Sequence, residues 1–288
     1  MTMSSLIIKW QAIQQLTRLD KPIGTYLLLW PTYWALWIAC DGWPDRHLLL
    51  VFTLGVIVMR AAGCVINDFA DRNIDGQVER TQHRPLVSGL ITSKEAITLF
   101  GFLIGIALVL VSNLSGYTVS LSVVALGLAV LYPFMKRFTH LPQVILGAAF
   151  SWGMIMAFAE AKGEIPIVAW LLFSANLLWT VAYDTMYAMV DRDDDIKIGV
   201  KSTAILFGEN DKKIIGFLQL ATLALLFTVG ELLAFGWPYQ LSLVVVGGLF
   251  SYQQMLIVGR DRQRCFKAFL NNHVVGLVVF IGIVIESL

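Results

Sequence analysis

The chain has 288 residues, of which 57% are hydrophobic and 14% are charged, whereas a typical soluble domain has about 25% charged residues. Its 21 basic and 20 acidic side chains leave a net charge of +1, so no broad positive field is present to attract nucleic acid. These figures exclude an ordinary cytosolic globular protein, a disordered chain and a nucleic-acid-binding protein. Long uncharged runs separate the charges, and a spanning helix needs roughly 20 mostly apolar residues. The sequence therefore predicts an all-α, polytopic membrane protein.

The first 21 residues contain Lys9, Arg18 and Lys21 and no apolar core, which predicts a short amphipathic lead-in and no cleavable signal peptide. About nine spans are expected to follow in a single bundle. The uncharged run 96–135 is too long for one helix, so a turn is expected at residues 112–116. In chain order, the predicted spans are 23–40, 47–67, 96–113, 117–134, 141–159, 165–185, 213–232, 238–257 and 268–286.

Lysine and arginine residues are concentrated in alternate loops of this arrangement. The N-terminal segment and the loops on its side of the membrane hold 18 of the 21 basic residues. The opposite loops hold only Arg46 and Lys162, and Arg60 lies inside the second span. Because loops rich in basic residues stay in the cytoplasm, the N-terminus and the basic loops are predicted to be cytoplasmic and the C-terminus to lie outside.

The two longest cytoplasmic loops also carry most of the acidic residues, at a constant offset. Asp68 and Asp184 are 116 residues apart, and so are Asp75 and Asp191. Four spans connect the two acidic helices, so both are expected to leave the membrane on the same side, as a shared site requires. The chain is thus predicted to be one membrane domain, residues 1–288, with related halves at about 20–135 and 136–286.

The first acidic motif consists of Asn67, Asp68, Asp71 and Asp75. On a helix of 3.6 residues per turn, the three aspartates share one face. Carboxylates aligned on one stripe repel each other unless a cation neutralises them. All four residues are therefore candidate metal ligands.

The second acidic motif is denser, with Asp184 followed by four aspartates within residues 191–195. Asp184, Asp191 and Asp195 fall at positions i, i+7 and i+11, which again lie on one helix face. Asp193 and Asp194 point elsewhere and are expected to be solvated. The three residues on the shared face are the candidate metal ligands of this motif.

Carboxylate pairs without His or Cys suit Mg²⁺, which usually takes one or two protein carboxylates and completes its shell with substrate phosphate. Two such faces, opposed across a bundle, predict a diphosphate site bridged by metal. The alternative for each motif taken alone is a solvated cytoplasmic loop. Three observations favour a metal site over a solvated loop. The two motifs recur at one offset, both begin within uncharged helices, and both keep helical spacing.

Basic residues lie beside both motifs on the same side of the membrane. Contact with lipid headgroups and the retention of positive loops in the cytoplasm explain most of them. Arg137 and Lys201 are the better candidates for diphosphate contacts, and Arg72 is a further candidate substrate-binding residue.

Arg60 differs from the other basic residues because it lies inside a span. It precedes Asp68 by eight residues, which places it about 12 Å deeper at 1.5 Å per residue. An intramembrane arginine costs at least about 2.5 kcal/mol on insertion scales and marks a candidate functional site. The small residues 61–64 allow a cavity beside it. Arg60 is therefore predicted to hold an acidic co-substrate, and a structural ion pair within the bundle is the alternative.

The two acidic motifs, together with residues 83–89, resemble those of the UbiA superfamily of intramembrane aromatic prenyltransferases. The resemblance covers essentially the whole chain and shows no departure from the family's metal-binding pattern. Residues 18–24 and 183–195 are most similar to the bacterial members that prenylate 4-hydroxybenzoate. This resemblance implies a multi-pass protein of the bacterial inner membrane with its active site facing the cytoplasm.

The resemblance also implies a reaction and a set of roles. Two Mg²⁺ ions would bind a polyprenyl diphosphate, and its polyprenyl group would pass to the ring of 4-hydroxybenzoate, ortho to the hydroxyl, in ubiquinone biosynthesis. The surrounding membrane lipid suits the isoprenoid tail. Arg60 with Asn67 would hold the aromatic acid, and Tyr187 is expected to contact substrate. The implied catalytic residues are Asp71, Asp75, Asp191 and Asp195.

Two alternatives remain at this point. A transporter also shows internal repeats, but transporters place charges in several spans near the midplane, whereas here the acidic residues gather at one surface. The other alternative is a UbiA-type prenyltransferase with a different acceptor, such as one of the menaquinone pathway, a haem or a chlorin. These enzymes share the metal motifs, so only the acceptor pocket separates them.

Overall fold

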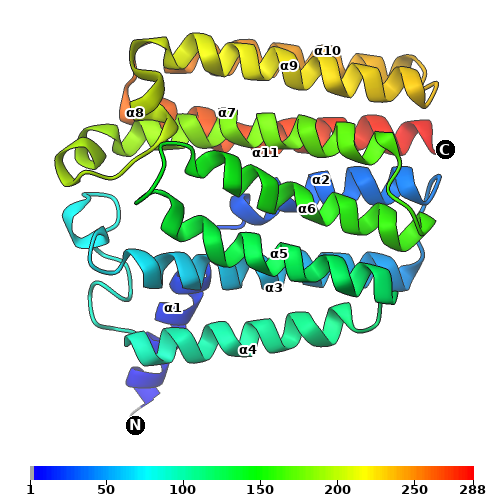
Figure 1. Ribbon diagram of the computed structural model, residues 1–288. Coiled ribbons are helices and arrows are strands. Elements are labelled where there is room, and N and C mark those ends of the chain that lie inside the picture. The colour runs from blue at the N-terminus through cyan, green and yellow to red at the C-terminus, as the bar shows by residue number, and fades with distance from the viewer. Residues whose placement is uncertain (1–2) are drawn as a thin grey trace.

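The computed structural model describes residues 3–288, which form a bundle of long helices lying roughly along one axis (Figure 1). The helices are α1 (Met3–Thr17), α2 (Ile23–Ala39), α3 (Arg46–Asp71), α4 (Ser93–Val111), α5 (Gly116–Met135), α6 (Pro142–Lys162), α7 (Ile167–Ile198), α8 (Thr203–Phe207), α9 (Asp211–Leu232), α10 (Trp237–Ile257) and α11 (Arg262–Glu286), with 3₁₀ turns η1 (Asp75–Gln77) and η2 (Gly208–Asn210).

The predicted all-α membrane fold is confirmed, and each of the nine predicted spans coincides with a long helix. In the described part of the chain, eight helices are long and apolar enough to cross a membrane. The ninth, α2, has 17 residues and no charged side chain. The turn expected at residues 112–116 separates α4 from α5.

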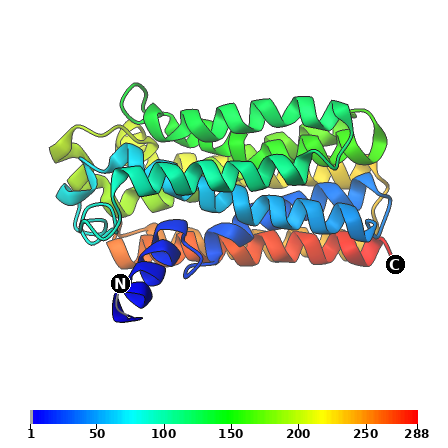
Figure 2. The same cartoon turned by 90° about the horizontal axis from the view of Figure 1, so that it is seen from below.

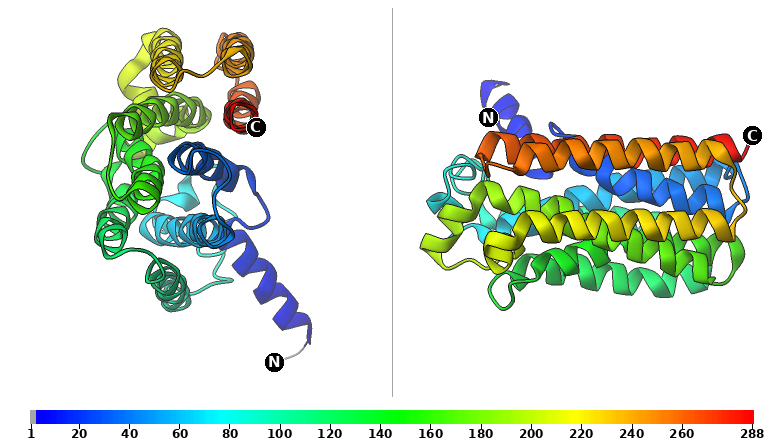
Figure 3. Two further views of the ribbon diagram at one scale, coloured as in Figure 1. Left: turned by 90° about the vertical axis from the view of Figure 1, so that its right-hand side faces the viewer. Right: turned by 90° about the horizontal axis from the view of Figure 1, so that it is seen from above.

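Several helices of the bundle face a common interior, and the others lie outside them. Seen along the bundle axis, α9 and α10 form a layer outside α7 and α11, while α4 lies at the opposite edge (Figure 3). Helix α1 projects from the bundle near the N-terminus (Figure 2). Helices α4 and α5 follow each other in the chain, yet each packs mainly on another neighbour, α4 on α3 and α5 on α6.

The core is tied together by tryptophans that span three helices. The rings of Trp34 on α2 and Trp179 on α7 are stacked, with their centroids 5.6 Å apart. The Trp34 indole donates a hydrogen bond of 2.9 Å to the carbonyl of Gly276 on α11. The Trp179 indole donates one of 2.8 Å to Asn272, also on α11. Because a buried indole N–H needs an acceptor, these bonds fix the relative positions of α2, α7 and α11.

Helices α3 and α7 run in the same direction, so their C-terminal ends lie at the same end of the bundle (Figure 1). The N-terminal helix lies at that end as well, and the C-terminus lies at the opposite end. Both acidic motifs are thereby brought to one end of the molecule, as the constant offset between them predicted.

The first acidic motif departs from the predicted single helix face. Helix α3 ends at Asp71, the amide of Ile74 donates back to the carbonyl of Asp71 (2.7 Å), and Asp75 begins η1. Asn73 and Gly76 surround this bend, and both residue types favour turns. Asp75 therefore reaches the site from a turn after the helix and not from the stripe that contains Asp71.

Helix α7 instead continues beyond its predicted end at residue 185 to Ile198. No glycine or proline interrupts residues 186–198, and Gly199 ends the helix with a left-handed φ of 74°. The amide of Val200 then donates to the carbonyl of Asp195 (3.0 Å), as in other glycine-terminated helices. The whole second motif is thus carried on one rigid helix.

Candidate active site

Both acidic motifs line one small polar cavity, of about 140 Å³, at the end of the bundle where α3 and α7 terminate. Residues from the loop after α3, from α5 and from the segment after α7 complete its wall. The predicted site residues that it brings together are Asn67, Asp71, Asp75, Asp184, Tyr187, Asp191, Asp195 and Lys201.

Asp71, the last residue of α3, is buried in the wall of the small cavity, with 2% of its surface exposed. One of its oxygens forms an ion pair with Lys136 of the segment after α5. Its other oxygen, Oδ1, is buried and has no hydrogen-bond partner. An unsatisfied buried carboxylate oxygen is costly unless a donor or cation reaches it.

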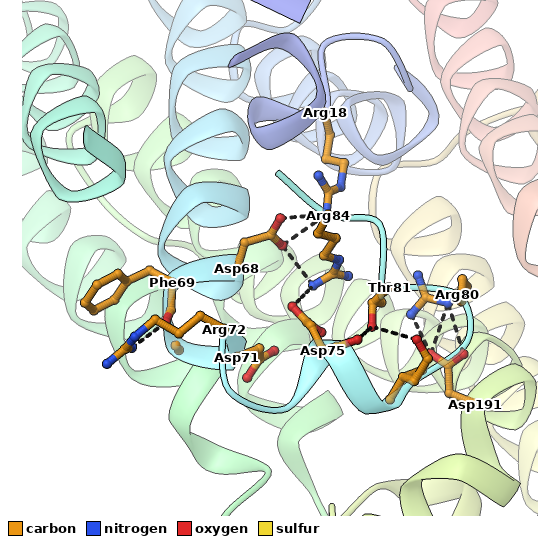
Figure 4. A network of polar contacts seen from close by, with 12 residues as sticks. Arg18, Asp68, Phe69, Asp71, Arg72, Asp75, Arg80, Thr81, Arg84 and Asp191 are labelled. Atoms are coloured by element: carbon orange, nitrogen blue, oxygen red, sulfur yellow. Dashed lines mark hydrogen bonds and ion pairs between the residues drawn. The ribbon is translucent and has the colours of Figure 1, made fainter. Parts of the chain in front are cut away.

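Arg84 links Asp68 and Asp75, whose carboxylates it contacts at 2.9 and 2.8 Å (Figure 4). Arg18, which follows α1, binds both oxygens of Asp68 at 3.0 and 2.9 Å. Burial raises the pKa of Asp75, and the Arg84 guanidinium acts in the opposite direction. Asp68 faces the interior side of this network and does not line the small polar cavity.

Arg80 connects the loop after α3 to α7. Its Nε lies 3.0 and 3.1 Å from the two carboxylate oxygens of Asp191, and its Nη1 donates to the Tyr187 hydroxyl. Figure 4 shows Arg80 beside Asp191, across the loop from Arg84. Two arginines of one loop therefore bind carboxylates of both acidic motifs.

The second motif divides as its helical spacing predicted. Asp184, Asp191 and Asp195 line the small cavity, whereas Asp193 and Asp194 do not. The carboxylates of Asp193 and Asp194 lie 3.7 and 3.2 Å from Arg262, outside the small cavity. Asp193 is exposed, as expected, but the predicted solvation of Asp194 is wrong, because its side chain is only 13% exposed and is ion-paired with Arg262.

A second and much larger cavity, of about 1280 Å³, lies inside the bundle and is lined mainly by apolar side chains of α2 to α7 and α11. Along α3 it extends from Asp68 to Val51, a distance of about 26 Å at 1.5 Å per residue. The residues that line both cavities, and so mark their junction, are Asn67, Arg80, Arg84, Tyr132, Asp184 and Tyr187.

Arg60 lines the large cavity on the same helix as the first motif. Its Nη1 donates to the Cys64 thiol, while its Nε is buried without a hydrogen-bond partner. Among the residues that the structure describes, no carboxylate forms an ion pair with it. The alternative of a structural ion pair within the bundle therefore has no support here.

The other predicted basic residues are placed less centrally. Arg72 is exposed, donates to the carbonyl of Phe69 and points away from the acidic network (Figure 4). Arg137 donates to the carbonyl of Ala70 and lines neither cavity. Lys201 lines the small cavity, with its ammonium 3.2 Å from the carbonyl of Phe138.

Several site residues were not predicted from the sequence. Arg80 and Arg84 follow the first motif in the sequence and Lys136 follows the helix that ends at residue 135, but counts of basic residues do not separate these three from lipid-facing ones. Tyr132, at the junction of the cavities, carries no spacing signal at all. The stretch 83–89, which includes Arg84, was the one available signal, because it follows the first motif directly.

The residues of the small cavity fit a divalent cation by their chemistry. All the candidate ligands are oxygen donors, which Mg²⁺ prefers, and the unpartnered Oδ1 of Asp71 is an acceptor of that kind. Within residues 3–288, no three His, Cys, Asp or Glu side chains converge closely enough to surround an ion. The carboxylates Asp71, Asp75 and Asp191 are paired with lysine or arginine instead.

The long apolar cavity opens into a small cavity lined by carboxylates and basic residues. This arrangement is that of a class of protein: membrane-embedded enzymes for a substrate with an apolar tail and an anionic head. The profile of the UbiA prenyltransferase family matches residues 28–280, and the chain belongs to this family. Membership of an enzyme family removes the support for a transporter.

Similar proteins have been characterised by sequence and by structure. The chain is 74% identical over 280 residues to a 4-hydroxybenzoate octaprenyltransferase of Colwellia psychrerythraea (97% of this chain, 98% of the relative). It is 60% identical over 275 residues to the enzyme of that name from Citrobacter koseri (96% and 95%). A UbiA homologue from Aeropyrum pernix K1, 25% identical, matches with a TM-score of 0.81 (92% and 98%). One from Archaeoglobus fulgidus, solved with GPP and Mg²⁺, is 19% identical with a TM-score of 0.76 (96% and 99%).

Proposed function

We propose that the protein transfers a polyprenyl group from a polyprenyl diphosphate to the ring of 4-hydroxybenzoate, ortho to the hydroxyl, as a Mg²⁺-dependent step of ubiquinone biosynthesis. The observation that carries this proposal is the junction of the two cavities, where an apolar channel meets carboxylates from both motifs. The relatives at 74% and 60% identity bear the name of this activity.

The polyprenyl tail would occupy the large cavity, and the diphosphate would lie in the small one. Lys136, Lys201, Arg80 and Arg84 are the cavity-lining cations available to it. Arg72 and Arg137, which line neither cavity, stay predictions as further substrate contacts. Basic groups at fixed positions stabilise the charge that develops on a leaving diphosphate.

The proposed metal ligands are those of the two motifs, with two ions in all. Mg²⁺, when bound, neutralises the diphosphate and assists its departure. Asp71, Asp75, Asp191 and Asp195 are proposed as the residues essential for this step, because each lines the small cavity. Asn67, Asp68 and Asp184 are proposed as further metal ligands.

The acceptor would lie at the junction. Arg60 would bind the carboxylate of 4-hydroxybenzoate, and Asn67 and Tyr187 would contact the substrates from opposite sides, since they belong to α3 and α7. The bond between the prenyl C1 and the diphosphate oxygen breaks, and its electrons leave with the diphosphate. The ring carbon then bonds to C1 and loses its proton. The apolar cavity excludes water that would otherwise capture the cation.

In the cell, the small cavity is proposed to face the cytoplasm from the bacterial inner membrane, with the C-terminus outside. The end of the bundle that carries the cavity also carries most of the basic residues, as expected for cytoplasmic loops.

The decisive experiment is to incubate purified membranes that contain the protein with labelled 4-hydroxybenzoate, Mg²⁺ and polyprenyl diphosphates of several lengths. We expect the label to become extractable into organic solvent, to be lost with EDTA and to be restored by added Mg²⁺. If 4-hydroxybenzoate yields no labelled lipid, and a labelled polyprenyl diphosphate instead transfers its prenyl group to a menaquinone precursor, a haem or a chlorin, the acceptor is a different one within the family.

A further inference from the structure

Gly24 lies against the guanidinium of Arg60. It is the second residue of α2, and both residues line the large cavity. A Cβ built on Gly24 would lie 2.7 Å from Nε and 2.9 Å from Cζ of Arg60, and nearer still to Nη2. Any residue larger than glycine at this position would displace the guanidinium, because real Cβ contacts are not this short.

The two nitrogens nearest to this point form one edge of the guanidinium. Nη1, the third nitrogen, already donates to the Cys64 thiol. The Nε–Nη2 edge presents two parallel N–H groups, the arrangement that binds a carboxylate through two hydrogen bonds. Nε is buried and has no partner. The edge that Gly24 leaves uncovered is therefore the edge that still needs an acceptor.

We infer that Gly24 determines acceptor specificity: by carrying no side chain, it keeps the Nε–Nη2 edge of Arg60 open for the carboxylate of the aromatic substrate. The inference rests on the proposed function, because it assumes an acidic acceptor at Arg60. Gly24 does not contact the reacting atoms. It acts through Arg60, as a positioning residue.

An ordinary packing role for Gly24 makes a different prediction. Where a glycine permits close contact between helix backbones, an added methyl group destabilises the fold. Here the atoms in the way are the end of a flexible side chain, which can move without separating α2 from α3. Gly24→Ala should therefore alter the position of the Arg60 guanidinium while leaving the stability of the bundle nearly unchanged.

The test compares Gly24→Ala with Gly101→Ala. Gly101 lies on α4, with nothing within 4 Å of an added Cβ, and it lines neither cavity. We expect Gly24→Ala to raise the KM for 4-hydroxybenzoate about tenfold or more, the size expected for losing hydrogen bonds to a charged group. The KM for the polyprenyl diphosphate and the melting temperature should match those of Gly101→Ala.

Two further measurements separate action through Arg60 from other effects. In an Arg60→Ala background, adding Gly24→Ala should not raise the KM for 4-hydroxybenzoate further, because the edge is already gone. At one fixed concentration, 4-hydroxybenzoate should raise the melting temperature of the wild type more than that of Gly24→Ala, because the variant binds it more weakly.

Each outcome decides the matter. If the wild type forms no product from 4-hydroxybenzoate, the proposed function fails and the inference fails with it. If the wild type is active but Gly24→Ala behaves like Gly101→Ala, or adds a further loss to Arg60→Ala, only the inference fails. A lower melting temperature together with a rise in both KM values would make Gly24 a packing residue.

Discussion

Asp71 and Asp193 carry the same functional group in opposite surroundings. Asp71 lines the small cavity and has a buried oxygen without a partner, whereas Asp193 is exposed near Arg262. We expect Asp71→Ala and Asp191→Ala to lower kcat/KM by about 100-fold or more, the scale reported for removing one preorganised stabilising group. Steady-state assays in membranes, normalised to the amount of inserted protein, measure the loss.

Asp193→Ala is the matched control, since it removes a carboxylate from the same helix without changing the cavity. It should retain activity within about twofold of the wild type, as surface substitutions generally do. Near-normal turnover in Asp71→Ala and Asp191→Ala would contradict a site shared by the two motifs.

Arg60→Lys tests whether a positive charge alone, deep in the bundle, is enough to bind the carboxylate of the acceptor. Lysine keeps the positive charge but loses the planar fork that binds both carboxylate oxygens. We expect a rise in the KM for 4-hydroxybenzoate of about tenfold, with little change in the KM for the polyprenyl diphosphate. A selective loss of diphosphate affinity would instead assign Arg60 to the leaving group.

At the scale of the elements, the sequence predicted the helices well because apolar length and uncharged runs are local properties. It also predicted that α3 and α7 bring their motifs to one end, since the number of spans between them fixes their relative direction. The position of Asp75 was predicted less well, because the turn at Asn73 and Gly76 removes it from the helix. Ion pairs such as Arg80 with Asp191 join residues 111 apart, and no local pattern encodes which arginine of a loop meets which carboxylate.

The loop between α3 and α4 is held over the site by its arginines. Arg80 binds Asp191 and Tyr187 on α7, and Arg84 binds Asp68 and Asp75. We expect Arg80→Ala to free residues 72–92 from α7, to speed cleavage of that loop by protease and to raise the KM for the polyprenyl diphosphate several-fold. Limited proteolysis and steady-state kinetics measure the two effects.

Gln82→Ala serves as the control for this loop, because Gln82 is exposed and its side chain makes none of these ion pairs. Its proteolysis pattern and kinetics should match those of the wild type. Faster cleavage without a change in KM would show that Arg80 holds the loop but has no part in diphosphate binding.

At the scale of the whole molecule, two related halves would explain why α3 and α7 run in the same direction. They would also explain the constant offset of 116 residues between the two motifs. The relation between the halves at about 20–135 and 136–286 stays a prediction. Neither half by itself contains a complete small cavity, because the cavity wall needs carboxylates from both halves.

The orientation of the molecule follows from its charge distribution and from its termini, which lie at opposite ends of the bundle (Figure 1). The end with the small cavity carries most of the basic residues, while Arg46 and Lys162 lie at the other end, where α3 begins and α6 ends. Since basic loops are retained in the cytoplasm, the cavity should open to the cytoplasm, where soluble 4-hydroxybenzoate and Mg²⁺ are available. Reporter fusions along the chain test this orientation. Fusions after residues 90, 137, 205 and 264 should report the cytoplasm, and those after 43, 115, 162 and 288 the outside.

A cytoplasmic signal from the fusion after residue 288 would require an even number of crossings. In that case α2, the shortest of the helices at the nine predicted spans, would lie at the membrane surface, or another of these helices would fail to span the membrane. If α2 did not cross and the N-terminus stayed in the cytoplasm, the fusion after residue 43 would report the cytoplasm and every later signal would be inverted. The later signals would be unchanged only if the N-terminus lay outside, on the same side as residue 43. Comparing the fusion after residue 43 with a reporter fused to the N-terminus distinguishes these cases. Agreement of all eight C-terminal fusions with the alternating pattern would place the carboxylates of both motifs on the cytoplasmic side, because α3 and α7 end there together.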